Sequence, residues 1–182
     1  VRILNESQEL VGTGSVQGDV VKCLAVRADC QREGVVFAKL VSHLLEYLHL
    51  KHIHHCFVFT RPEKTESFQH LGFKEIARVE PLIALLETGQ PDLEDYKEYL
   101  RAHKRQSPNI GGIGVCIVNC NPFTLGHRYL IETAAQQCSY LYVIAVEEDL
   151  SVFPFKVRFD LIQKGTADLA NVCVLEGGKY VI

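Results

Sequence analysis

Hydrophobic and polar residues follow two spacings along the first half of the chain. Residues 1–26 form three strand-like runs separated by turn-forming residues, and residues 34–48 then change to helical spacing. A short apolar run, a helix that begins at Pro62 and two more strand-like runs follow. The expected strands are 1–4, 9–16, 20–26, 56–60, 73–79 and 82–87, and the expected helices are 34–48 and 62–70. The pattern predicts one mixed α+β unit over residues 1–88.

A different pattern begins after a charged connecting segment. Residues 89–112 read as a connecting helix, 93–103, followed by a linker. Strand and helix then alternate, with expected strands at 113–118, 140–146 and 172–175 and expected helices at 126–138 and 155–169. This alternation predicts right-handed crossovers and a Rossmann-like parallel sheet over 113–182. We therefore expect an α/β chain of two units, neither of them a complete domain.

Composition excludes several classes of protein. The chain has 182 residues, 47% of them hydrophobic, and a formal net charge of −3, so it lacks the basic excess of a nucleic-acid or anionic-membrane binder. No apolar run approaches the roughly 20 residues of a membrane span, and the first residues do not resemble a signal peptide, so we expect a cytoplasmic protein. The seven cysteines form no C-x-x-C pair; we interpret most as buried apolar residues and predict no metal site.

The strongest chemical signal joins the first strand and the first helix of the second unit. It is the segment Asn119-Cys120-Asn121-Pro122-Phe123-Thr124-Leu125-Gly126-His127. A loop that leaves the carboxyl end of a parallel strand is where open α/β sheets bind ligands. A helix beginning at Gly126 offers unpaired N–H groups to an anion, and Thr124 and His127 add a hydroxyl and an imidazole donor. These groups suit the charge that develops during an in-line phosphoryl displacement. Because such a route needs no thiol nucleophile, we interpret Cys120 as a packing residue.

The end of this segment, Asn-Pro-Phe-Thr-Leu-Gly-His, is similar to the T/H-x-G-H motif of nucleotidylyltransferases, which transfer AMP or CMP from ATP or CTP. The resemblance implies that His127 contacts the nucleotide phosphates and stabilises the transition state. Thr124 takes the first motif position. Asn121 and Phe123 are implied to line the nucleotide site, with Gly126 beside the phosphates.

A second part of the same pattern follows the next strand. Residues 153–158, Phe-Pro-Phe-Lys-Val-Arg, look like the superfamily's F-[ST]-x-x-x-R segment, which implies that Arg158 begins a helix near the phosphates or the second substrate. The related phosphopantetheine adenylyltransferases carry lysines just before this segment. This chain has Glu147-Glu148-Asp149 there, which argues against the same phosphorylated acceptor.

The first unit carries a separate resemblance. Residues 27–36 lie between a predicted strand and a predicted helix, and they resemble the Q/R-x-x-G-x-G/A element of GNAT acyltransferases. That element holds the pyrophosphate of coenzyme A through backbone amides, a role that would fall on Gln31 and Gly34, although Val36 stands where a small residue is expected. Residues 68–73 resemble the family's terminal y-x-x-x-G-F, and the order of elements agrees. A GNAT-like fold is implied, but no motif places a general base.

A GNAT-like unit ahead of a nucleotidylyltransferase unit resembles one family in particular, the [citrate (pro-3S)-lyase] ligases, also called citrate lyase synthetases. The similarity covers nearly all of residues 111–182. It implies ATP-dependent acetylation of the thiol on the dephospho-CoA-type prosthetic group of the citrate lyase acyl carrier subunit. Acetate, ATP and the thiol would give the thioester, AMP and pyrophosphate, with Mg²⁺ beside ATP, although the sequence shows no carboxylate cage for the metal.

The sequence is also compatible with three other functions. The first is a plain adenylyltransferase that acts on a nucleotide or on a phosphopantetheine-like acceptor. The second is a GNAT acetyltransferase that uses acetyl-CoA without ATP. The third is an acyl-CoA-binding or regulatory module whose second unit has lost catalysis, against which the intact Thr124 and His127 speak.

Overall fold

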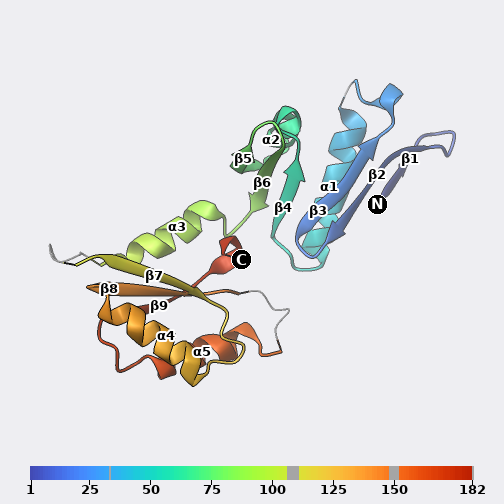
Figure 1. Cartoon of the computed structure of the whole chain (residues 1–182). Coiled ribbons are helices and arrows are strands. Elements are labelled where there is room, and N and C mark those ends of the chain that lie inside the picture. Colours follow the sequence, from blue (N-terminus) through green and yellow to red (C-terminus); the bar gives the residue numbers. More distant parts are fainter. Residues whose placement is uncertain (33, 106–110, 148–151, 182) are drawn as a thin grey trace. The chain divides into compact units, whose positions relative to one another are not determined.

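The computed structural model describes residues 1–32, 34–105, 111–147 and 152–181. The chain divides into two compact units, Val1–Lys97 and Glu98–Ile182 (Figure 1). The first unit contains a mixed sheet and the second a parallel sheet, so the predicted α/β class is confirmed. The division falls inside the predicted connecting helix, whereas the boundaries placed at residues 88 and 112 stay predictions. Residues 106–110 of the predicted linker lie outside the described residues.

A six-stranded sheet with the order β1-β2-β3-β4-β6-β5 forms the first unit. Its strands and helices match the predicted ones to within a few residues. They are β1 (Arg2–Leu4), β2 (Leu10–Gln17), β3 (Val20–Val26), α1 (Val35–Leu50), β4 (His55–Thr60), α2 (Thr65–Gln69), β5 (Lys74–Val79) and β6 (Ile83–Gly89). A short 3₁₀ turn, Pro62–Lys64, leads into α2.

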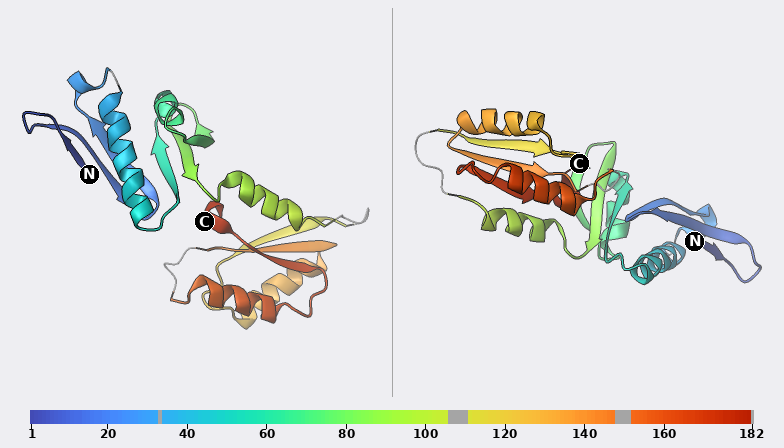
Figure 2. Two further views of the ribbon diagram at one scale, coloured as in Figure 1. Left: turned by 180° about the vertical axis from the view of Figure 1, so that it is seen from behind. Right: turned by 90° about the horizontal axis from the view of Figure 1, so that it is seen from below.

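One apolar core lies between this sheet and its helices. The inward face of α1 is buried at Leu40, Val41, Leu44 and Leu48, which have the i, i+3, i+4 spacing of an amphipathic helix. Figures 1 and 2 show α1 along β1–β3 and α2 beside β5 and β6. The Phe68 ring of α2 meets the Phe37 ring of α1 edge-on, with 5.1 Å between the ring centres. The two helices therefore share one core on the same face of the sheet.

A gap in strand pairing follows from the register of β3 and β4. These two strands run parallel and pair through only two residue pairs, Val20 with Phe57 and Val21 with Val58. Beyond these pairs no ladder joins the strands, although β3 continues to Val26 and β4 to Thr60. The strands therefore diverge toward their carboxyl ends, where a pocket described below opens.

A buried polar pair lies on the other face of this sheet. His55 Nε2 of β4 lies 2.8 Å from Glu87 Oε2 of β6, and both side chains are about 2% exposed. The second carboxylate oxygen of Glu87 accepts a hydrogen bond from the Leu93 N–H at the start of α3 (Leu93–Ala102). The Glu87 carboxylate therefore links β4, β6 and the N-terminus of α3.

Three parallel strands in the order β7-β8-β9 form the sheet of the second unit. Its elements are β7 (Ile113–Val118), α4 (Leu125–Gln136), β8 (Tyr140–Ala145), α5 (Phe155–Gly165) and β9 (Val172–Glu176). Figures 1 and 2 show α4 and α5 on one face of this sheet, where Ile131 and Ile162 are fully buried. The predicted alternation of strand and helix is confirmed, but α5 ends at Gly165 and not at the predicted 169.

The interpretation of most cysteines as buried residues is wrong in part. Only Cys56 and Cys120 are fully buried, and Cys23 is exposed. Cys23 lies where the register between β2 and β3 shifts, and its φ of 54° is the left-handed conformation found at such irregularities. In the part of the chain that the structure describes, a helix that could span a membrane is absent.

Candidate functional site

The loop after β7 ends at the N-cap of α4. The third residue of this helix, His127, takes part in the cap. Thr124 is the N-cap of α4, and its side chain accepts a hydrogen bond from the backbone N–H of His127. In return, the Thr124 N–H donates to His127 Nδ1 over 3.1 Å. This is a capping box in which histidine replaces the usual glutamate or glutamine. Two reciprocal bonds therefore determine where the imidazole lies.

These bonds also determine which ring nitrogen of His127 can donate. A backbone N–H can only donate, so Nδ1 is an acceptor and the proton of the neutral ring sits on Nε2. The Thr124 hydroxyl oxygen lies 2.8 Å from the same Nδ1. In the part of the chain that the structure describes, Nε2 has no hydrogen-bond partner, and the His127 side chain is half-buried. The imidazole thus presents one N–H donor to an approaching group.

Further donors lie beside this nitrogen at the start of α4. Within the described residues, the N–H groups of Leu125 and Gly126 have no partner, because intrahelical bonds begin with the Arg128 N–H. A Cβ at Gly126 would meet only the Thr124 hydroxyl oxygen, at 3.7 Å. Packing within the chain therefore does not require glycine there, and the bare Cα leaves room for another group. The positive end of the helix dipole adds to this attraction for an anion.

Phe123 and Asn121, predicted to line the nucleotide site, lie in the same loop. The Phe123 ring packs against Gly165 at the end of α5, where a Cβ would come within 2.3 Å of it. The same ring stacks on the His127 ring at 6.1 Å between centres. Asn121 is exposed, and its Oδ1 accepts a hydrogen bond from the Phe153 N–H at 3.1 Å. Phe123 therefore forms one wall beside the imidazole, and Asn121 joins two loops.

Cys120 is placed as a packing residue. Its side chain is 1% exposed, and burial raises the pKa of the Cys120 thiol to about 11, although the nearby Arg158 acts in the opposite direction. A thiol with such a pKa is almost entirely protonated at neutral pH, so it is a poor nucleophile.

Arg158 begins α5 as predicted, but its side chain is turned inward. The residue is fully buried, and its guanidinium donates to carbonyl oxygens of the loops at Asn119, Val146 and Phe153. These bonds hold the Arg158 side chain in the interior, against the loop carbonyl oxygens, and not at the exposed start of α4. The expectation that Arg158 faces the phosphates finds no support in this arrangement.

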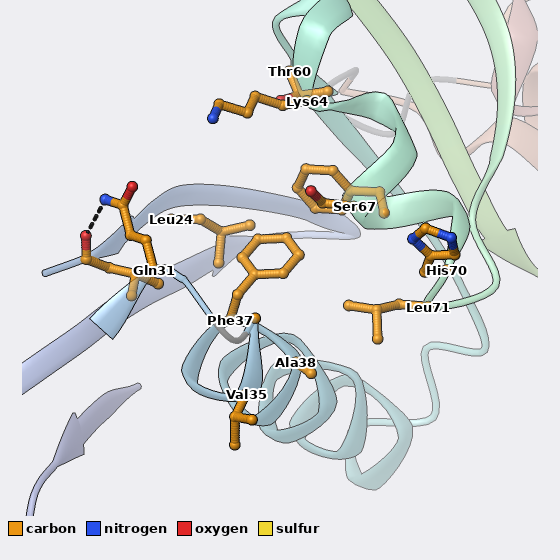
Figure 3. Close-up of a pocket in the computed structure, with 13 residues that line it drawn as sticks. Leu24, Gln31, Val35, Phe37, Ala38, Thr60, Lys64, Ser67, His70 and Leu71 are labelled. Atoms are coloured by element: carbon orange, nitrogen blue, oxygen red, sulfur yellow. Dashed lines mark hydrogen bonds between the residues drawn. The ribbon is translucent and has the colours of Figure 1, made fainter. Parts of the chain in front are cut away.

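A second candidate site is the pocket of the first unit, about 610 Å³ in volume. It opens between the diverging ends of β3 and β4 and the start of α1 (Figure 3). Its apolar wall includes Leu24, Phe37, Phe68 and Leu71, and its polar lining includes Gln31, Thr60, Lys64, Ser67 and His70. The pocket therefore combines an apolar body with polar groups around it.

Gln31 and Gly34 both line this pocket. The Gln31 side-chain amide donates to the Val26 carbonyl oxygen at 2.7 Å, so it ties the loop to the end of β3 (Figure 3). Gly34 is the N-cap of α1, with a φ of 67° that a side chain rarely adopts. Among the residues that the structure describes, no side chain caps α1, which leaves its first-turn amides available at the pocket. His43 and Glu46, two acid–base side chains on α1, do not line the pocket, so neither is placed there as a general base.

Comparisons with known proteins found similar sequences for this chain. Residues 113–182 match the family described as the citrate lyase ligase C-terminal domain. Three curated relatives are each named [citrate [pro-3S]-lyase] ligase: those of Escherichia coli and Haemophilus influenzae are 35% identical to this chain, and that of Klebsiella pneumoniae is 36% identical. These matches cover 98–99% of the chain. The chain is thus similar to citrate lyase ligases over nearly all of its length.

The chain spans about half the length of these curated citrate lyase ligases, 50% of the first and 52% of the other two. A crystal structure from Agrobacterium tumefaciens, named as a proposed acetyltransferase, is 21% identical, with a TM-score of 0.42. That match covers 49% of this chain and 72% of the other. The predicted resemblance to the citrate lyase ligases is therefore confirmed, and the GNAT-like name of the first unit stays a prediction.

Sequence reasoning missed several residues of the pocket in the first unit. Lys64, Ser67 and His70 reach the pocket from the segment after β4, which no motif connects with Gln31 or Gly34. A lysine and a histidine near a predicted strand end were the available signals, but only the folded chain brings them to the pocket.

The described residues contain no group of three or more His, Cys, Asp or Glu side chains that could hold a metal ion. They therefore supply no protein cage for the Mg²⁺ that the family resemblance implies. Of the acidic segment 147–149, only Glu147 is described, and its Oε1 accepts a hydrogen bond from the Gly178 N–H. We assign no step to a metal.

Proposed function

We propose that the full-length protein acetylates the prosthetic-group thiol of the citrate lyase acyl carrier subunit through an acetyl-adenylate. An acetate oxygen attacks the α-phosphorus of ATP, and pyrophosphate leaves. The carrier thiol then attacks the acetyl carbonyl carbon, loses its proton to solvent and displaces AMP. Two observations support the proposal: the similarity to proteins named as citrate lyase ligases and the donor set at the start of α4. Because ATP and a reduced thiol are required, we expect this reaction in the cytoplasm.

The observation that carries the adenylation step is the orientation of the His127 ring. Since the Thr124 N–H occupies Nδ1, the neutral ring keeps Nε2–H as its donor, at the same helix start as the free N–H groups of Leu125 and Gly126. Three donors at one helix start can hold phosphate oxygens and stabilise the charge that grows on them as pyrophosphate leaves. Thr124 acts as a positioning residue because its bonds go to the imidazole.

ATP–pyrophosphate exchange on the full-length protein tests this function. We expect labelled pyrophosphate to enter ATP only when acetate is present, because the reversible first step forms acetyl-adenylate. Exchange that requires a phosphorylated acceptor and ignores acetate would instead support the plain adenylyltransferase. Acetyl transfer from acetyl-CoA without ATP would support a GNAT acetyltransferase.

The pocket of the first unit is the second part of the proposal. We place the CoA-like arm of the carrier in it, with the pyrophosphate at the α1 amides near Gly34 and the pantetheine along the apolar wall. Figure 3 shows Lys64 extending from the far side of the pocket toward the side of Gln31. Among the described residues Lys64 has no carboxylate partner, so its ammonium is available to a phosphate.

Binding of dephospho-CoA to the full-length protein tests the pocket. We expect Lys64→Ala to weaken the affinity about tenfold, the scale for one lost charge-assisted hydrogen bond, as measured by calorimetric titration. The matched control is Lys51→Ala, at the opposite end of α1, which should leave the affinity unchanged. No binding at millimolar dephospho-CoA, or equal affinities for both variants, would count against this placement.

A further inference from the structure

Arg158 joins two loops through one buried side chain. Its Nε donates to the Phe153 carbonyl oxygen at 3.0 Å. Its Nη1 lies 2.8 Å from both the carbonyl oxygen and the side-chain oxygen of Asn119, and 2.9 Å from the carbonyl oxygen of Val146. The residue is fully buried. Because a buried cation is costly unless it is well bonded, a hydrophobic residue would be the simpler choice if only packing were needed.

The acceptors of Arg158 belong to the two segments that leave neighbouring parallel strands. Asn119 directly follows β7, Val146 directly follows β8, and Phe153 precedes α5. A second bond joins the same segments, from the Phe153 N–H to Asn121 Oδ1 at 3.1 Å. We call Arg158, Asn119, Asn121 and Phe153, with these bonds, the loop clamp.

The loop clamp stands directly before the helix cap that orients His127. Arg158 holds Asn119 and the Phe153 N–H holds Asn121, each by a hydrogen bond. Only residues 122–124 separate Asn121 from α4. Within this short loop the Phe123 ring rests on Gly165 of α5. Movement at Asn119 would therefore pass along a few residues to Thr124, whose two bonds determine the direction of His127 Nε2.

We propose that Arg158 is a positioning residue for adenylation: it holds the loop so that the amides of α4 and His127 Nε2 converge on one phosphate. This inference rests on the proposed function. Donors aimed at a developing charge are effective only when they are held in place before the reaction, and a misplacement of about 1 Å can cost about 100-fold in rate. The guanidinium acts through the loop and not by contact with ATP.

The test compares variants of α5 in the full-length protein. Arg158→Lys keeps a cation but cannot reach all four oxygens, whereas Ile162→Ala removes buried volume one turn further along the same helix and takes away none of the hydrogen bonds of the loop clamp. We expect Arg158→Lys to lower the rate of ATP–pyrophosphate exchange at saturating ATP about 10–100-fold. Ile162→Ala should lower the melting temperature at least as much, yet keep the exchange rate within about threefold of the wild type.

Hydrogen exchange of the amides in residues 119–127 gives a readout that does not depend on activity. We expect these amides to exchange faster in Arg158→Lys than in Ile162→Ala. If Arg158→Lys does not fold, Asn119→Ala removes one acceptor of the clamp and should change rate and hydrogen exchange in the same direction by less.

Equal effects of Arg158→Lys and Ile162→Ala on rate and hydrogen exchange would overturn the inference, because Arg158 would then only stabilise the fold. A wild-type protein without ATP–pyrophosphate exchange would contradict the proposed function instead. In that case the hydrogen-exchange comparison alone decides whether the clamp holds the loop.

Discussion

Replacing His127 by alanine should slow acetate-dependent ATP–pyrophosphate exchange about 10²–10³-fold, the scale for removing one preorganised donor from a transition state. The physical reason is the loss of Nε2–H, a side-chain donor that has no partner among the described residues and lies at the same helix start as the free amides of Leu125 and Gly126. The exchange rate at saturating ATP and acetate is the measurement.

His127→Gln is the matched control for this prediction. A glutamine at the third helical position completes the usual capping box, so its side-chain oxygen can accept from the Thr124 N–H. We therefore expect this variant to keep the melting temperature of the wild type and, because its amide still offers an N–H donor, to lose less exchange activity than His127→Ala. A near-normal exchange rate in folded His127→Ala would show that the imidazole has no catalytic role.

Replacing Glu87 by alanine should destabilise the first unit by about 3–5 kcal/mol, the scale for removing one partner of a buried polar pair. The change leaves His55 buried without its 2.8 Å partner and removes the acceptor of the Leu93 N–H. Urea-induced unfolding, combined with hydrogen exchange of amides in β4 and β6, measures the loss.

Two further variants separate this effect from general damage. Glu87→Gln keeps the size and one carbonyl oxygen for the Leu93 N–H, so we expect a smaller loss than for alanine. Lys97→Gln breaks only the exposed ion pair with Glu94 and should change the unfolding free energy by less than about 0.5 kcal/mol. Equal losses for Glu87→Ala and Lys97→Gln would mean that the buried pair contributes no more than a surface one.

The arrangement of elements could be predicted from the sequence because each has its own spacing of apolar residues. The end of α5 could not be predicted in this way, because Leu169 continues the spacing of Phe155 and Ile162 although the helix ends at Gly165. The Thr166 hydroxyl donates to the Ile162 carbonyl oxygen, and the Thr166 carbonyl oxygen accepts from the Leu169 N–H in a separate turn. Competition of this kind between local hydrogen bonds does not change the spacing of apolar residues, so this spacing does not show where the helix ends.

At the candidate site, too, contacts between residues close in sequence could be predicted, whereas contacts between distant residues could not. Thr124 and His127 are three residues apart, so their proximity could be predicted from sequence, although a histidine in the capping box could not. The direction of Arg158 depends on oxygens 5 to 39 residues away, which no motif specifies. The register shift that turns Cys23 outward is likewise a property of paired strands and not of one segment.

A crystal structure of the full-length protein with a non-hydrolysable ATP analogue tests the central claim most directly. We expect phosphate oxygens within hydrogen-bond distance of His127 Nε2 and of the N–H groups of Leu125 and Gly126. A nucleotide bound elsewhere, with the His127 ring making no contact to it, would mean that the start of α4 is not the nucleotide site.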